Sequence, residues 1–204
     1  MEFITYSHRH GEKLLETEYP ELWKEVQEVI ESISEEELIK KFPISGNKKS
    51  LSAAVNQLLK EKFVSKGWLK EAPIFQDPEY SAKAETAWRL DFAKDEISIE
   101  VSFNHGEALA WNLTKPVLAC EMNHVRKAIN TKIGIIILAT EQFKRSGAFD
   151  SAVGEYEKAI RYLKPMNDLL SVPLVLIGLK SPKTFMIKTT KVGNVNIGKV
   201  KMLN

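Results

Sequence analysis

Leu90-Asp-Phe-Ala-Lys-Asp-Glu-Ile-Ser-Ile-Glu-Val-Ser-Phe103 is the stretch of sequence that decides the fold of this chain. Its pattern predicts two short strands joined by a polar turn at residues 93–96. Because side chains alternate along a strand, Glu100 and Ser102 are expected on one face and their neighbours on the core face. The hairpin would bring Asp91 of the first strand back beside Glu100.

Two carboxylates and a hydroxyl would then share one small volume among apolar neighbours. Close carboxylates repel each other unless a cation neutralises them, and Mg²⁺ prefers oxygen ligands. The hairpin therefore indicates a divalent-metal site at Asp91 and Glu100. The alternative is that both residues are solvated surface acids close to a turn.

Length and composition fit one globular domain over residues 1–204. The chain is 44% hydrophobic and 27% charged, which is ordinary for a protein with its own core. No run of eighteen apolar residues predicts a membrane span, and residues 1–8 lack the pattern of a secretory signal. Cys120 is the only cysteine, which excludes an internal disulfide and a cysteine-rich zinc module. We expect a cytoplasmic protein.

Charge is distributed unevenly, although the net charge is only +2. Residues 1–40 contain eleven glutamates, whereas no acidic residue follows Asp168. Such a basic end suits a segment that follows nucleic-acid phosphates, or a surface that keeps exposed strands soluble. The lysines after Asp168 are Lys180, Lys183, Lys188, Lys191, Lys199 and Lys201.

Helices and strands are expected to alternate along the rest of the chain. Apolar spacing and helix-end signals predict helices that begin at Pro20 and after Ser34, and helices at residues 50–65, about 106–129 and 152–163. Extended segments are predicted at residues 68–75, 133–138, 172–178, 184–190 and 194–200, with polar loops at 76–84 and 140–150 and a turn at 44–47. This order predicts an α/β domain with a central mixed β-sheet flanked by helices.

The pattern Asp91-x8-Glu100-x-Ser102, followed by a helix and an apolar strand, resembles the PD-(D/E)xK nuclease core. The similarity extends to the type II restriction endonucleases of the BglII, BstYI and BamHI group. Four segments resemble that group in the same order: Tyr19–Glu25, Lys60–Trp68, Ile99–Phe103 and Val172–Leu179. The resemblance implies the single-domain restriction-endonuclease-like fold and Mg²⁺-dependent hydrolysis of phosphodiester bonds.

The resemblance also implies an active site made of Glu71, Asp91, Glu100 and Ser102. Asp91, Glu100 and Glu71 would bind the metal ion. Ser102 departs from the group, which has glutamine or glutamate there, and from other nucleases, which have lysine. A serine is a short, neutral and weak ligand, and it cannot act as a general base at neutral pH without an activating neighbour. The nucleophile would therefore have to be a metal-bound water or hydroxide, relayed through Glu71.

DNA bases would be read by two segments that follow core strands. Asparagine pairs well with adenine and arginine with guanine. Two of these positions, Asn104 and Asp150, have an alternative interpretation, because each precedes a predicted helix and suits an N-cap. The expected reading residues are Asn104, His105, Arg145, Ser146, Asp150 and Ser151.

The implied partner is double-stranded DNA, bound by a homodimer at a short palindrome, for which the resemblance suggests a GATC-centred target. Helices at about 106–129 and 152–165 would form the dimer face. A cognate DNA methyltransferase is expected as a functional partner that does not bind this chain, and no membrane is involved. Two alternatives stay open: a sequence-specific DNA-binding protein with a degenerate nuclease site, which Ser102 favours, and a repair or nicking nuclease of the same fold.

Overall fold

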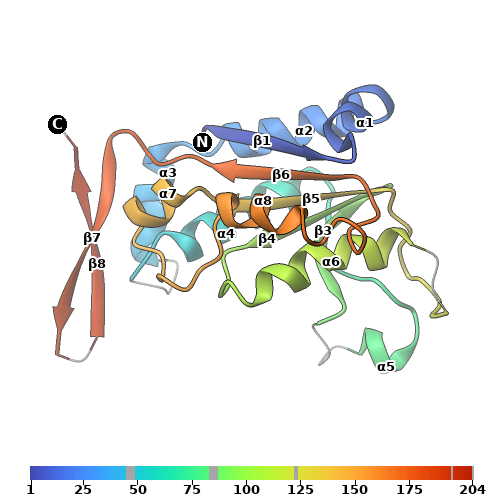
Figure 1. Cartoon of the computed structure of the whole chain (residues 1–204). Helices are drawn as coiled ribbons and strands as arrows, with labels where there is room; N and C mark the ends of the chain where they lie inside the picture. The colour runs from blue at the N-terminus through green and yellow to red at the C-terminus, as the bar shows by residue number, and fades with distance from the viewer. Residues whose placement is uncertain (45–48, 83–86, 122–123, 194, 204) are drawn as a thin grey trace.

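A six-stranded mixed sheet lies at the centre of the computed structural model, which describes residues 1–44, 49–82, 87–121, 124–193 and 195–203 (Figure 1). From one edge to the other, the sheet contains β1 (Phe3–His8), β6 (Leu174–Leu179), β5 (Ile133–Ala139), β4 (Ile97–Ser102), β3 (Arg89–Lys94) and β2 (Leu69–Pro73). Strands β4, β5 and β6 are parallel, and the other pairings are antiparallel. The predicted α/β fold with a mixed sheet is confirmed.

Helices cover both faces of this sheet. One core contains side chains from α2 (Pro20–Glu31), α3 (Glu35–Lys41) and α4 (Ser52–Ser65), and the other contains side chains from α6 (Ala108–Cys120) and α8 (Tyr156–Leu163). Every residue of β5 and β6 is buried, as expected for central strands with helices on either side. The two apolar runs were therefore correctly predicted as core strands.

The N-terminal segment holds two elements that the sequence analysis did not predict. Strand β1 pairs antiparallel with β6 at the edge of the sheet, and α1 (Gly11–Glu18) follows it. The predicted helices at Pro20 and after Ser34 are confirmed. Ser34 begins α3 with a reciprocal capping box, in which its side chain accepts a hydrogen bond from the Glu37 backbone N–H.

Several predicted boundaries were wrong. The helix expected at about residues 106–129 is α6, which continues through Pro116 but ends at Cys120. The expected loop at 140–150 contains α7 (Glu141–Ser146), and the loop at 76–84 contains the short α5 (Pro78–Ser81). Most of the turn predicted at 44–47 lies outside the described residues; Ile44 ends the short 3₁₀ helix η1 (Phe42–Ile44).

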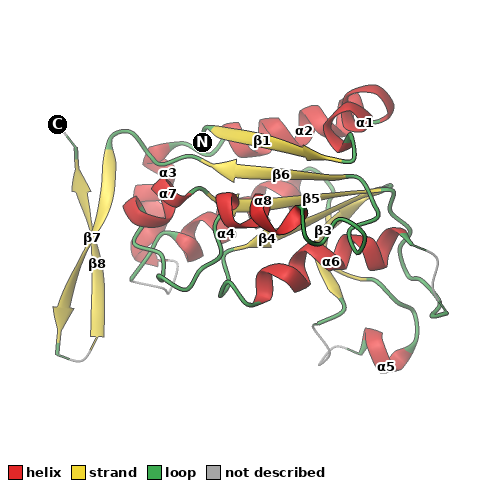
Figure 2. Ribbon diagram, viewed as in Figure 1, coloured by secondary structure: helices red, strands yellow, loops and turns green. Residues whose placement is uncertain are grey.

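The lysine-rich end forms a separate two-stranded ribbon of β7 (Phe185–Val192) and β8 (Val195–Met202), beyond the end of β6 (Figure 2). Phe185 and Ile187 anchor its base in the core, whereas the outer part of the ribbon is exposed. Among the described residues, no helix is long and apolar enough to cross a membrane.

Candidate active site

The predicted carboxylate pair lies where the β3–β4 hairpin stops pairing through its backbone. Regular pairing extends from Lys94 and Ile97 to Phe92 and Ile99. One residue further, side chains replace the ladder. The Asp91 backbone N–H donates to Glu100 Oε1 at 3.2 Å, and the Val101 N–H donates to Asp91 Oδ2 at 2.7 Å. These two hydrogen bonds hold the carboxylates side by side, as the sequence predicted.

Both carboxyl groups are buried, and both pKa values are raised. Glu100 is only 1% exposed, and burial together with the negative charge of Asp91 raises its pKa to about 8. Burial is also the main cause that raises the pKa of Asp91. Desolvation and like charge both disfavour the ionised forms, so a cation between the two groups would relieve the repulsion. Val101 and Phe103 face the apolar core, as predicted, and the opposite face of β4 is covered as well, because Glu100 and Ser102 are each 1% exposed.

Glu71 lies on the neighbouring strand β2 and lines the same cavity as the pair. Its backbone has φ 49°, and the β2–β3 register omits it between Lys70 and Ala72. Its exposed side chain is 3.5 Å from the Lys60 ammonium, and its charge contributes to the raised pKa of Asp91. Within the described ranges, no three His, Cys, Asp or Glu side chains cluster closely enough for a metal site. A direct ligand role for Glu71 stays a prediction.

Ser102 is 1% exposed and is absent from the cavity lining. Its hydroxyl accepts a hydrogen bond of 2.9 Å from the side-chain amide of Asn112 on α6. The hydroxyl therefore has a structural partner, and this contact gives no support to a metal-ligand role.

Lys115 was not predicted from the sequence, although it contacts the carboxylate pair directly. Its Nζ lies 2.9 Å from Glu100 Oε2, and its side chain is only 11% exposed. The available signal was that Lys115 is the one charged residue in the sequence of α6. The cavity in front of the pair has a volume of about 220 Å³. It is lined by Asn56, Lys60, Lys70, Glu71, Asp91, Phe92, Glu100, Val101, Asn104, Asn112 and Lys115.

The two expected DNA-reading segments lie next to each other. His105 forms an antiparallel bridge with Val153, and the Gly154 N–H donates to the carbonyl of Asn104 at 3.2 Å. Both Asn104 and His105 are exposed, and Asn104 lines the same cavity as Asp91 and Glu100. The sequence therefore correctly brought Asn104 close to the carboxylates.

The second reading segment differs from the prediction. Arg145 and Ser146 lie on helix α7 instead of in a loop, and Arg145 forms an ion pair with Glu141. Ser151 is exposed in the turn that follows. Asp150 is exposed and lies 2.9 Å from the Lys49 ammonium.

The N-cap alternatives for the reading residues are wrong. The N-cap of α6 is Glu107 and that of α8 is Glu155, so neither Asn104 nor Asp150 caps a helix. Asp150 instead accepts a hydrogen bond of 3.0 Å from the Ala152 N–H within a turn.

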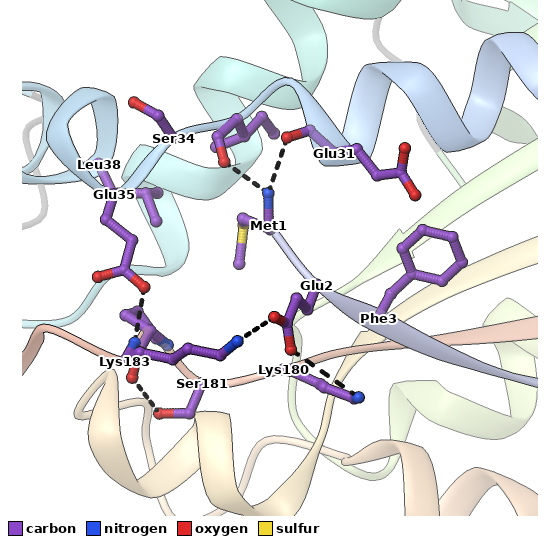
Figure 3. Close-up of a pocket in the computed structure, with 12 residues that line it drawn as sticks. Met1, Glu2, Phe3, Glu31, Ser34, Glu35, Leu38, Lys180, Ser181 and Lys183 are labelled. Atoms are coloured by element: carbon purple, nitrogen blue, oxygen red, sulfur yellow. Dashed lines mark hydrogen bonds and ion pairs between the residues drawn. The ribbon is translucent and has the colours of Figure 1, made fainter.

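A second cavity, of about 570 Å³, lies between the N-terminus, α3 and the segment that leads into the ribbon (Figure 3). Glu2 forms ion pairs with Lys180 and Lys183, and Glu35 accepts hydrogen bonds from the backbone N–H groups of Lys183 and Thr184. These contacts connect the base of the ribbon to the body. Glu2 and Glu35 therefore already have partners, and this cavity is a structural joint.

The mixed sheet flanked by helices is the restriction-endonuclease fold. Residues 3–179 match the family model of restriction endonucleases BglII/BglIII, so the chain belongs to this family of type II site-specific deoxyribonucleases. A crystal structure of restriction endonuclease BglII complexed with a DNA 16-mer is similar, with a TM-score of 0.68, 20% identity and full coverage of both chains. Free BglII gives a TM-score of 0.59 at 20% identity, covering 99% of this chain and 93% of that one. No curated protein sequence gave a match.

Proposed function

We propose that the chain cuts double-stranded DNA at a short palindromic site in a Mg²⁺-dependent reaction, as a homodimer. The observation that carries the proposal is the buried pair of Asp91 and Glu100 with raised pKa values, facing a cavity that also holds lysines. Buried acids with perturbed pKa values in a cavity are typical of catalytic sites.

The residues present fit a Mg²⁺ ion. This ion commonly uses one or two carboxylates and fills its remaining positions with water and phosphate oxygens. Asp91 and Glu100 would hold it, and Glu71 would orient a water from across the cavity. A bound Mg²⁺ lowers the pKa of its water and polarises the scissile phosphate. Lys60 and Lys70 line the same cavity, and their charges favour entry of a phosphate.

Base reading is proposed for two adjacent surfaces. Asn104 and His105 would contact bases beside the cut, and Asn104 is suited to adenine. On α7 and the turn after it, Arg145 is suited to guanine, once it exchanges Glu141 for a base. Ser146, Asp150 and Ser151 complete this second surface. The resemblance further supports a GATC-centred target and a cognate methyltransferase that protects it.

A homodimer follows from the palindrome, because two identical sites on opposite strands require a two-fold axis. Helices α6 and α8 supply the proposed dimer face. Trp111, Val117 and Leu118 of α6 are only partly buried within one chain, which leaves apolar area for a partner.

The second candidate function is sequence-specific DNA binding without cleavage. One observation favours it: Ser102, at a position where related nucleases have a functional side chain, is buried and bonded to Asn112. A monomeric repair or nicking nuclease is the third possibility on the same fold.

Digestion of a sequenced supercoiled plasmid separates these functions. With Mg²⁺, we expect discrete linear fragments, which disappear with EDTA and with Asp91→Ala. Gel-shift binding without any cut would identify the inactive module, and open circles alone would identify a nicking enzyme. Sedimentation of the protein on a duplex tests the dimer, and one chain per duplex would contradict it.

A further inference from the structure

We propose that Lys115 is a catalytic residue that places a positive charge against the scissile phosphate from helix α6. This inference rests on the proposed nuclease function and adds to it a role for a residue outside the hairpin. It also explains how the site works with a serine at position 102.

Position 102 on strand β4 does not supply this positive charge. Ser102 is neutral, 1% exposed and hydrogen-bonded to Asn112, and it does not line the cavity. A phosphate in the cavity would therefore meet no charge from this strand position. The positive charge nearest to Glu100 comes from Lys115.

Lys115 is well placed for a phosphate. Its ammonium lies 2.9 Å from Glu100 Oε2 and lines the cavity that contains Asp91. An ammonium group has three hydrogens. Among the described residues, Glu100 is the hydrogen-bond acceptor found for Lys115, so hydrogens remain for a phosphate oxygen.

The helix and the strand match each other along their contact. Asn112 and Lys115 are three residues apart on α6 and so share one helix face. Ser102 and Glu100 are two residues apart on β4 and so share one strand face. Asn112 donates to Ser102, and Lys115 donates to Glu100, so two consecutive contacts fix the register of helix on strand.

Close packing at the next residue, Pro116, fixes how near Lys115 lies to the sheet. Gly134 of β5 lies against Pro116, and a Cβ added at Gly134 would overlap the Pro116 ring and lie 2.8 Å from Leu174 Cδ2. Both Pro116 and Gly134 are buried. Helix α6 therefore lies directly on the sheet next to Lys115, which lets a lysine reach the carboxylate pair.

The chemical role is electrostatic. Negative charge on the phosphoryl oxygens must be stabilised as the phosphodiester bond breaks, and a fixed cation in a water-poor site does this well. The competing explanation is that Lys115 only neutralises buried Glu100. The two roles differ when metal is saturating, because a bound cation replaces a counter-ion but does not replace a contact to the phosphate.

The test compares Lys115→Met and Lys115→Arg with the wild type. The substrate is a duplex that carries the cut site mapped on the plasmid, and the rate is measured in single turnover at saturating Mg²⁺. The matched control is Lys94→Met. Lys94 lies on the same hairpin but outside the cavity, and its ammonium forms a part-buried ion pair of 2.8 Å with Glu25.

We expect Lys115→Met to cleave about 10²- to 10³-fold more slowly, as when one transition-state donor is removed. Lys115→Arg, which keeps the charge, should be at least about tenfold faster than the methionine variant. Lys94→Met should cleave at the wild-type rate. Calorimetric titration with Ca²⁺ gives a readout besides cleavage. In the absence of DNA, the Lys115→Met protein should bind Ca²⁺ at least as tightly as the wild type, because no ammonium competes for Glu100.

Two results overturn the inference. A Lys115→Met rate close to the wild-type rate at saturating Mg²⁺ would leave only the counter-ion role, while the proposed nuclease function survives. Equal rates for the methionine and arginine variants would exclude a role for the charge. If Lys115→Met does not fold, Lys115→Gln is judged by the same criteria. A wild-type protein that never cuts DNA overturns both the function and the inference.

Discussion

Replacing Glu100 with glutamine is expected to stabilise the metal-free protein more strongly as pH rises. Burial and the charge of Asp91 raise the pKa of Glu100 from 4.5 to about 8. Below about pH 4.5 the carboxyl is protonated in folded and unfolded chains alike. Between that pH and about 8, the unfolded chain releases the proton that the folded chain keeps, so the free energy of unfolding falls with pH. Above this range both forms are ionised and the loss stays constant.

The size of the effect follows from that window. One pKa unit corresponds to about 1.4 kcal/mol, so the cost grows by about 3 kcal/mol between pH 5 and pH 8. Glutamine does not ionise. The difference in unfolding free energy between Glu100→Gln and the wild type should therefore increase by about that amount over the range. The change with pH is the test, because losing the hydrogen bond to Lys115 alters the difference at every pH.

Urea denaturation in EDTA at pH 5, 6.5 and 8 measures this difference. Glu96→Gln on the same hairpin is the control. Hydrogen bonds from Lys132 and Tyr19 lower the pKa of exposed Glu96, so its stabilising contribution is present at high pH and lost as pH falls. Because that loss falls below about pH 4.5, the control difference should stay nearly constant between pH 5 and pH 8. A Glu100→Gln difference that stays constant from pH 5 to pH 8 would refute the claim that burial destabilises the Glu100 anion.

Three further predictions concern packing, the ribbon and a helix end. Gly134→Ala should lower the free energy of unfolding by about 1–3 kcal/mol through overpacking, and an unchanged urea midpoint would show that α6 has room to move. Lys188 and Lys199 are opposite each other and exposed on the ribbon. Changing both to glutamine should reduce, by about two, the slope of the logarithm of the DNA-binding constant against the logarithm of salt concentration. Lys183→Gln should not change this slope, because Lys183 is paired with an acid. An unchanged slope in the double variant would indicate a solubilising surface. Ser34→Ala should lower the free energy of unfolding, measured by thermal denaturation, by about 1 kcal/mol. An unchanged free energy of unfolding would contradict a stabilising capping box.

Local patterns were sufficient to predict the hairpin, the core strands and the capped helix. The carboxylate pair could be predicted because strand alternation and a short turn alone bring Asp91 to Glu100. Lys115 could not be placed from the sequence, because its position depends on how α6 packs on β5 through Pro116 and Gly134. Such a contact between distant segments has no local signature.

The false helix boundary at residue 129 also has a physical cause. Val125 and Ile129 have helical spacing and are half-buried, which fits an amphipathic helix. They pack instead against the cluster that contains Phe75, while Lys127 forms an isolated bridge with Phe75. These apolar side chains thus reach the core from an extended segment. Their spacing in the sequence alone does not distinguish this segment from a helix.

The energetic cost of the site argues for a working nuclease over a degenerate one. Removing charges from water costs several kcal/mol per ion in proteins, and replacing a buried ion pair by apolar residues is often stabilising. Glu100 is buried, Lys115 beside it is only 11% exposed, and the pKa of Asp91 is raised as well. A module that only binds DNA gains nothing from this arrangement, because the exposed Asn104 and His105 need no buried acids to contact bases. The proposed cleavage would use it, since a metal ion and a phosphate together would match two acids and one base. Ser102 is then explained by its structural bond to Asn112, while the positive charge reaches the site from the adjacent helix.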